Sequence, residues 1–213
     1  KNLKISNNIA TVGGGGISCE ACDSRITDTD VTNNTVTGIG GGIRVFNGSN
    51  PELLNVSIQN NTSSSNGGGI SYEGLPGNST IQTMNRVTIS GNSSSEGVGG
   101  GAYLYSSTVN ASRTYIQNNA ALVKGGGISI EWASELNIEN AFISGNILTD
   151  GVQGSNVYIG KSDQLIGSNE KLIAMNVNMI DTVALSNENL FSMYTNGLVK
   201  PLLINSIAIG RLD

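Results

Sequence analysis

Three aspartates in one short stretch are the residues whose type and spacing come closest to catalytic chemistry. Asp23, Asp28 and Asp30 lie within the sequence DSRITDTD. Carboxylate oxygens bind hard cations such as calcium, and a pair of carboxylates can hydrolyse a glycosidic bond. Asp23, Asp28 and Asp30 are therefore the candidate metal ligands, and Asp28 with Asp30 is the candidate catalytic pair.

Other residues that carry chemistry are scarce. Histidine is absent, which excludes histidine acid–base catalysis and most zinc sites. The two cysteines, Cys19 and Cys22, form the motif CEAC, but no helical pattern follows it, so thioredoxin-like redox chemistry is not indicated. A small disulfide between them or two free thiols remain, and export of the protein would favour the disulfide. We expect no cofactor and, in the leading interpretation, no metal and no catalytic residue.

The composition restricts the partners of the chain. Only 13% of its 213 residues are charged and the net charge is −5, which argues against nucleic acid and against an anionic membrane surface. No apolar run is long enough for a transmembrane helix, so no membrane insertion of this segment is expected. The sequence begins within the repeat pattern described next, and we therefore expect it to be a fragment or a processed product.

Two motifs recur along the chain, and the structure they form must position the aspartate and cysteine side chains. One is a run of glycines before an aliphatic residue or alanine, at 14–17, 40–43, 67–70, 99–102 and 125–128. The other is an aliphatic residue, two further residues and an asparagine. Its asparagines are Asn8, Asn34, Asn61, Asn92, Asn119 and Asn146. Both motifs return every 26–27 residues, and both take one longer step between the third and fourth copies, which identifies a structural repeat.

The repeat unit predicts an all-β fold, a right-handed parallel β-helix of the pectin-lyase-like kind with rungs of about 26–27 residues. Apolar and polar residues alternate within each unit, as in Ile128 and Ile130, which is the period of a strand. The glycines are expected at a tight corner that needs positive φ or close backbone approach. The repeated asparagines are expected to form a ladder between rungs at another corner.

The regular pattern ends near residue 160. Residues 1–160 are expected to form the Gly/Asn-repeat rungs. Residues 161–213 are expected to form degenerate final rungs or a cap of the same domain, because the last rung of a solenoid must be covered. The aliphatic segments at 171–180 and 198–210 are suited to further rungs without the glycine corner.

Alternation after the glycines predicts which side chains point outward. Cys19, Val45, Tyr72, Leu104 and Ile130 are expected to face the interior. One outward column is Ser18, Arg44, Ser71, Tyr103 and Ser129, and the next is Glu20, Phe46, Glu73, Tyr105 and Glu131. Exposed rings beside carboxylates suit a sugar- or protein-binding strip. The candidate ligand-binding residues are Phe46, Glu73, Tyr103, Tyr105 and Glu131.

The paired motifs resemble the repeats of the chlamydial polymorphic membrane proteins, which are autotransporter adhesins. That family pairs Gly-Gly-Ala plus an aliphatic residue with Phe-x-x-Asn. Here the corresponding stretches read GGGI or GGGA and, with Ile or Val in place of Phe, ISNN, VTNN, IQNN and ISGN. The resemblance covers about residues 1–160. It implies an exported, rod-like, adhesive passenger at the cell surface or outside the cell, anchored to the outer membrane in the parent protein.

Three functions follow from these observations. The first is a non-enzymatic adhesin passenger or stalk that binds a cell-surface protein or glycan through its outward columns. The second is a polysaccharide lyase or hydrolase, or a tailspike-like module, because β-helix enzymes of this kind place acids, basic residues and often calcium on one outer face. The third is a structural filament or sheath component that self-associates along the solenoid.

Overall fold

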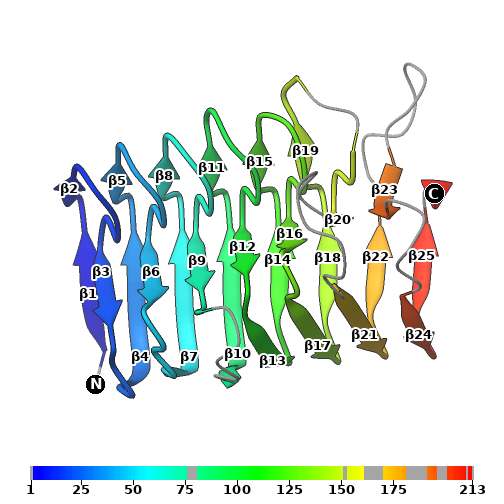
Figure 1. The fold of residues 1–213 in the computed structure, drawn as a ribbon, viewed down its shortest axis with the longest axis horizontal. Coiled ribbons are helices and arrows are strands. Elements are labelled where there is room, and N and C mark those ends of the chain that lie inside the picture. Colours follow the sequence, from blue (N-terminus) through cyan, green and yellow to red (C-terminus); the bar gives the residue numbers. More distant parts are fainter. Residues whose placement is uncertain are drawn as a thin grey trace.

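The computed structural model describes residues 2–75, 81–150, 153–160, 170–180, 191–195, 201–209 and 211–212. Within these residues the regular secondary structure consists of strands, and each strand pairs in parallel with its neighbours. The rungs stack in chain order along the long axis (Figure 1). The predicted all-β, parallel solenoid fold is confirmed.

Within the described residues the strands form three sheets, of which sheets 1 and 3 continue to the last described strands and sheet 2 ends at β19. Sheet 1 contains β1 (Leu3–Ser6), β4 (Arg25–Thr32), β7 (Glu52–Gln59), β10 (Ile81–Ser90), β13 (Thr108–Ser112), β14 (Tyr115–Gln117), β17 (Glu135–Glu139), β18 (Phe142–Ser144), β21 (Lys171–Met175), β22 (Asn178–Ile180), β24 (Leu202–Ile204) and β25 (Ile207–Ile209). Sheet 2 contains β2 (Ile9–Ala10), β5 (Thr35–Val36), β8 (Thr62–Ser63), β11 (Ser93–Ser94), β15 (Ala120–Ala121) and β19 (Ile147–Leu148). Sheet 3 contains β3 (Ile17–Glu20), β6 (Ile43–Phe46), β9 (Ile70–Glu73), β12 (Ala102–Tyr105), β16 (Ile128–Glu131), β20 (Val157–Gly160), β23 (Phe191–Thr195) and β26 (Arg211–Leu212).

The glycine block forms the corner that leads into sheet 3. Its first glycine is left-handed on each rung that has the block, with φ of +74° at Gly40 and +66° at Gly99, a region that side chains with a Cβ rarely adopt. The next glycine meets the neighbouring rung, because a Cβ on Gly41 would overlap the carbonyl oxygen of Gly68. Both reasons expected from the sequence, positive φ and close backbone approach, therefore apply.

The repeated asparagines form a continuous hydrogen-bonded ladder at the corner between sheets 1 and 2. Asn92 is representative: its backbone N–H and its Nδ2 donate to Asn119 Oδ1 at 3.0 and 2.9 Å. Its Nδ2 also donates to the Ile58 carbonyl oxygen at 2.9 Å. Its Oδ1 accepts from the backbone N–H and Nδ2 of Asn61 at 2.9 and 3.0 Å. Each buried amide is thereby satisfied by the rungs on both sides.

Asn156 extends this ladder beyond its last regular member. Asn156 stands in register with the third glycine of the block, Gly127, because Ile128 pairs with Val157. Asn146 Nδ2 donates to Asn156 Oδ1 at 2.8 Å. On the earlier rungs the ladder asparagine of the next rung accepts the equivalent hydrogen bond, as Asn146 does from Asn119. A side chain from the glycine corner therefore replaces the acceptor that the repeat supplies on the earlier rungs.

The later aliphatic segments join the stack without a glycine block. β21 and β22 pair with β17 and β18, and β24 and β25 continue the same sheet. The described strands within 171–180 and 198–210 thus continue sheet 1. Whether 161–213 also caps the solenoid stays a prediction.

The interior of the solenoid is a stack of aliphatic side chains that surrounds one tyrosine. Tyr72 is 0% exposed and occupies the register position of Val45 and Leu104. Its hydroxyl has no hydrogen-bond partner within the described part of the chain. Burial raises the pKa of this phenol, so the group stays neutral and its unmet hydrogen bond costs stability.

Replacing Tyr72 with phenylalanine is therefore expected to stabilise the fold by about 1–2 kcal/mol, because the orphaned hydroxyl disappears and the ring remains. Denaturant titration followed by circular dichroism measures the change. Tyr158→Phe is the matched control, because it removes the hydrogen bond that Lys124 Nζ donates to the Tyr158 hydroxyl at 3.2 Å. A Tyr72→Phe protein less stable than the parent chain would show that the hydroxyl has a buried partner.

Candidate ligand-binding face

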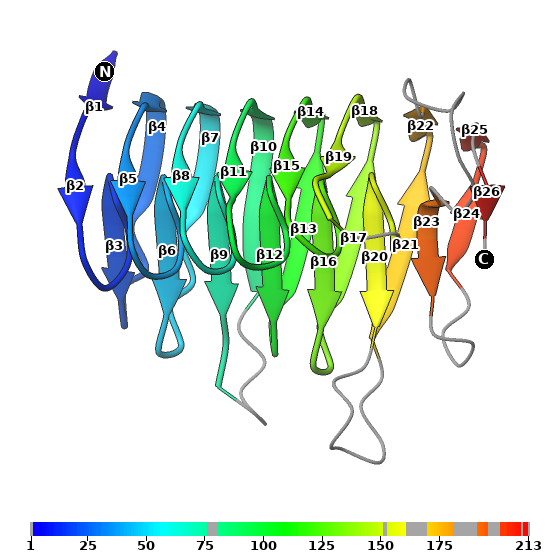
Figure 2. The same ribbon diagram turned by 90° about the horizontal axis from the view of Figure 1, so that it is seen from above.

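The outer face of sheet 3 carries the side chains that the sequence singled out for binding. Figure 2 shows β3, β6, β9, β12, β16 and β20 side by side in chain order. The residues predicted to face the interior are all buried: Cys19, Val45, Tyr72, Leu104 and Ile130. The predicted alternation is therefore confirmed, and the two outward columns lie on the opposite face of the sheet.

The first outward column is exposed at Ser18 but covered from Ser71 to Ser129, which corrects the prediction that Tyr103 belongs to an exposed strip. Tyr103, expected to be available for binding, is only 6% exposed, and its register partners Ser71 and Ser129 are fully buried. Side chains beside the column close over it. Tyr105 packs at 6.3 Å from the Tyr103 ring, and Lys124, which precedes a left-handed glycine, lies over Tyr158 further along the column. Tyr103 therefore supports the face rather than forming its surface.

The N-terminal part of the face is closed by an internal ion pair. Arg44 Nε and Nη2 donate to Glu73 Oε1 and Oε2 at 2.9 and 2.8 Å, with both side chains 18% exposed. Glu73 Oε1 also accepts from the Ser71 hydroxyl at 3.0 Å. The Arg44 guanidinium lies 4.3 Å from the centre of the Phe46 ring. Phe46 and Glu73, both predicted ligand-binding residues, are thus already engaged with a cation of the same chain.

The centre of the face is an aromatic pair to which Trp132 contributes. The rings of Tyr105 and Trp132 lie 5.3 Å apart at 43° to each other. Trp132 has a φ of +54°, a strained conformation for a bulky residue. Trp132 belongs to neither of the two outward columns predicted from the sequence. Its position in the repeat could have identified it. The only tryptophan of the chain follows Glu131, at a corner that other rungs fill with the small or polar residues Ala21, Asn47, Gly74 and Ser106.

Glu131 is the carboxylate next to this pair. Burial raises the pKa of Glu131, and the hydrogen bond that the Ser129 hydroxyl donates to its Oε1 at 2.9 Å offsets part of that rise. Lys124 also lowers this pKa, and Glu170 raises it. Within the described part of the chain Glu131 forms no ion pair, whereas Glu73 has Arg44. The centre therefore presents a partly buried carboxylate without a bound cation.

The aspartates suggested for catalysis or metal binding are not assembled into a cation site. Among the described residues, no three acidic, cysteine or histidine side chains converge. Asp28 lies at a left-handed corner, with a φ of +48°, and accepts a hydrogen bond from Asn55 Nδ2 at 2.7 Å. Asp28 and Asp30 border a shallow hollow of about 240 Å³ on sheet 1 that Arg86 also lines, whereas Asp23 lies apart from it. The corner interrupts the strand, so shared spacing in the sequence does not bring all three carboxylates together.

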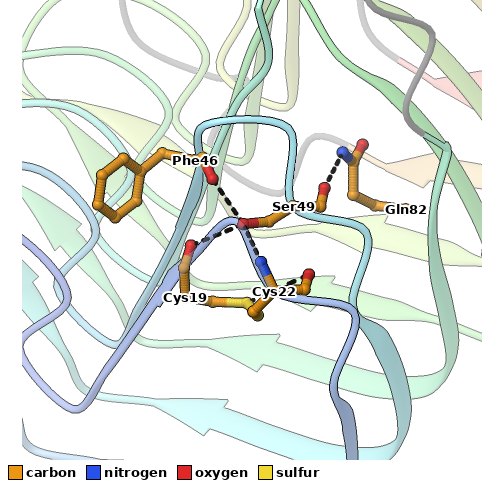
Figure 3. The surroundings of a disulfide bond; sticks show 5 residues. All are labelled: Cys19, Cys22, Phe46, Ser49 and Gln82. Carbon is orange, nitrogen blue, oxygen red and sulfur yellow. Dashed lines mark hydrogen bonds between the residues drawn. A yellow bond between two sulfur atoms is a disulfide. The ribbon is translucent and has the colours of Figure 1, made fainter.

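The two cysteines form a disulfide that closes the turn after β3. Cys19 and Cys22 are bonded, with their Cα atoms 5.6 Å apart. Figure 3 shows Ser49 of the next rung beside this turn. The Ser49 hydroxyl accepts from the Cys22 N–H at 3.1 Å and lies 3.0 Å from the Cys19 carbonyl oxygen, while Gln82 Nε2 donates to the Ser49 carbonyl at 3.0 Å. The disulfide thereby closes the turn, and the hydrogen bonds of Ser49 tie this turn to the next rung.

Within the described residues, no helix of the length and apolar character needed to cross a bilayer occurs.

Comparison with protein families finds a match to the Chlamydia polymorphic membrane protein repeat at residues 2–20 and 55–73. Each matched span contains a ladder asparagine, the glycine corner and a strand of sheet 3, and the two spans lie two rungs apart. Comparisons with curated proteins and with solved structures gave no match. This chain is a parallel β-solenoid, and in these two segments it is similar to the Chlamydia polymorphic membrane protein repeat, as the resemblance to the passengers of that family predicted.

Proposed function

We propose that this chain is the adhesive part of a cell-surface protein and that it binds a cell-surface protein or glycan through the centre of the outer face of sheet 3. The repeat belongs to a family of outer-membrane surface proteins, which supports both a surface location and a non-enzymatic role. The observation that carries the choice of surface is the tilted, partly exposed pair of Tyr105 and Trp132 beside Glu131.

Tyrosine and tryptophan are the residue types that most often dominate binding energy at interfaces. In this pair they stand on adjacent rungs of a rigid solenoid, so little order has to be gained when a partner binds. Trp132 has the left-handed backbone that Ala21 and Ser106 also adopt at this corner, so the corner itself places the indole beside Tyr105.

Attachment of beads coated with the chain to host or neighbouring cells tests this proposal. Exchange of both Tyr105 and Trp132 for serine is expected to lower the attached fraction about tenfold, as for loss of interface hot spots. Tyr115→Ser is the matched control, because Tyr115 is an exposed tyrosine on β14 of sheet 1. If the double variant keeps its β-structure by circular dichroism and still attaches like the parent chain, this surface is not the adhesive one.

A second candidate function is polysaccharide cleavage, because Asp28, Asp30 and Arg86 line one hollow on sheet 1. It requires that the length of an acidic or neutral polysaccharide falls on incubation with the chain and calcium. Asp28→Asn or Asp30→Asn would then abolish the cleavage. Unchanged polymer length across such substrates would remove this candidate.

A further inference from the structure

The outer face of sheet 3 pairs a cation with an aromatic ring at two places. Arg44 lies 4.3 Å from the centre of the Phe46 ring, and Lys124 Nζ lies 4.7 Å from the centre of the Tyr158 ring. Attraction between a cation and the face of a ring is strengthened when the site excludes water. The face thus already has the chemistry of a cation-binding surface, and its own side chains occupy both of these positions.

The Arg44 contact shows all the parts of such a position. The guanidinium stacks near the Phe46 ring and at the same time forms two hydrogen bonds with the Glu73 carboxylate. A ring and a carboxylate from adjacent rungs, joined in register, therefore hold one arginine side chain. This geometry is specific to a planar, forked cation.

The centre of the face has a ring and a carboxylate in the same register, and Tyr103 stands at the register position of Arg44. Tyr105 and Glu131 are register partners on adjacent rungs, as Phe46 and Glu73 are. Trp132 adds a second ring at 5.3 Å from Tyr105. Glu131 Oε1 accepts from Ser129, while Oε2 forms no hydrogen bond with any described residue. Lys124, the cation that acts on Glu131, donates its hydrogen bond to Tyr158 and not to this carboxylate.

We propose that Tyr105, Trp132 and Glu131 form a binding site for the guanidinium group of an arginine side chain presented by a protein partner. The inference rests on the proposed adhesive function and names the chemistry of the partner at the same site. The guanidinium stacks on the ring pair and donates to Glu131, as Arg44 does to Phe46 and Glu73 in the same chain. The net charge of −5 attracts basic segments of a partner to this surface.

The single tryptophan of the chain makes the site directly observable, because Trp132 is the only source of tryptophan fluorescence. The probe is an acetylated, amidated pentapeptide with one central arginine between glycine and serine residues. The control peptide has citrulline, the uncharged isostere, in the same place. We expect a saturable fluorescence change with a Kd on the order of 1 mM for the arginine peptide. No saturable response is expected for the citrulline peptide.

Two carboxylate variants locate the contact. Glu131→Gln is expected to weaken binding of the arginine peptide about tenfold, because the charge-assisted hydrogen bond is lost. Glu139→Gln, at an exposed carboxylate of sheet 1, is expected to leave binding unchanged. Since burial raises the pKa of Glu131, removing its charge should not lower the melting temperature at neutral pH. Tyr105→Leu provides a second variant with the same expected loss of binding.

The outcomes separate this inference from the proposed function. Equal responses to the arginine and citrulline peptides, or an unchanged Kd in Glu131→Gln, would overturn the guanidinium site. A lysine peptide that binds as tightly as the arginine peptide would also overturn it, because the forked geometry would then be irrelevant. If adhesion depends on Tyr105 and Trp132 but the arginine peptide does not bind, the adhesive face stands and the guanidinium site falls. If the arginine peptide binds but the chain does not attach to cells, the guanidinium site stands and the proposed adhesive function falls.

Discussion

Replacing Asn92 with alanine is expected to lower the free energy of unfolding by about 4 kcal/mol, because several buried groups lose their partners at once. Asn92 Oδ1 accepts from two donors of Asn61, and its Nδ2 donates to Asn119 and to the carbonyl oxygen of Ile58. Alanine leaves both Asn61 donors and the Ile58 carbonyl without these bonds in a fully buried corner. Urea unfolding followed by circular dichroism measures the loss.

Asn8→Ala is the matched control for this substitution. Asn8 is the first asparagine of the ladder and is exposed. Its backbone N–H still donates to Asn34 Oδ1 at 3.0 Å after the side chain is removed, so water can satisfy the groups that remain. The expected loss is below about 1 kcal/mol. If Asn92→Ala is as mild as Asn8→Ala, the ladder is not a main source of the stability of the solenoid.

Replacing Gly99 with asparagine is expected to cost about 3 kcal/mol or more, because the corner lacks room for a Cβ. Gly99 has a φ of +66°, which asparagine tolerates better than other residues. Its Cβ would nevertheless overlap the Ala102 carbonyl oxygen and lie 2.9 Å from the carbonyl carbon. These are backbone atoms within the turn and cannot move without disturbing the start of β12.

Gly91→Asn isolates the effect of space from that of backbone angle. Gly91 has a φ of +65°, nearly that of Gly99, but a Cβ there would meet only the end of the Asn60 side chain at close range. Asparagine already occupies this position on other rungs, at Asn7, Asn33, Asn60 and Asn118. The substitution is expected to change stability by less than about 0.5 kcal/mol, or to stabilise by restricting the unfolded chain. Equal losses in the two variants would show that φ alone selects glycine at Gly99.

The adhesive centre could be predicted only in part, because its residues come from different rungs. Alternation after the glycine block placed Tyr105 and Glu131 correctly on the outer face, since the side-chain period of a strand is two. Alternation does not say what covers an outward side chain. Tyr103 is therefore outward and yet buried, because Tyr105 packs against it. Trp132 follows its strand at a left-handed corner, where the period of two no longer applies.

The sequence by itself determined the fold, the rung length and the columns of this solenoid. Its repeats are stacked in register, so residues 26–27 apart become neighbours and a one-dimensional pattern predicts three-dimensional contacts. The tertiary structure decided every feature that breaks the repeat. Asn156 supplies a ladder acceptor from the glycine corner, and Asp28 lies at a left-handed bend within its strand. Arg44 contacts the Phe46 ring and the Glu73 carboxylate, which were both predicted to bind a ligand. Such contacts depend on side-chain reach and corner geometry, which periodicity does not encode.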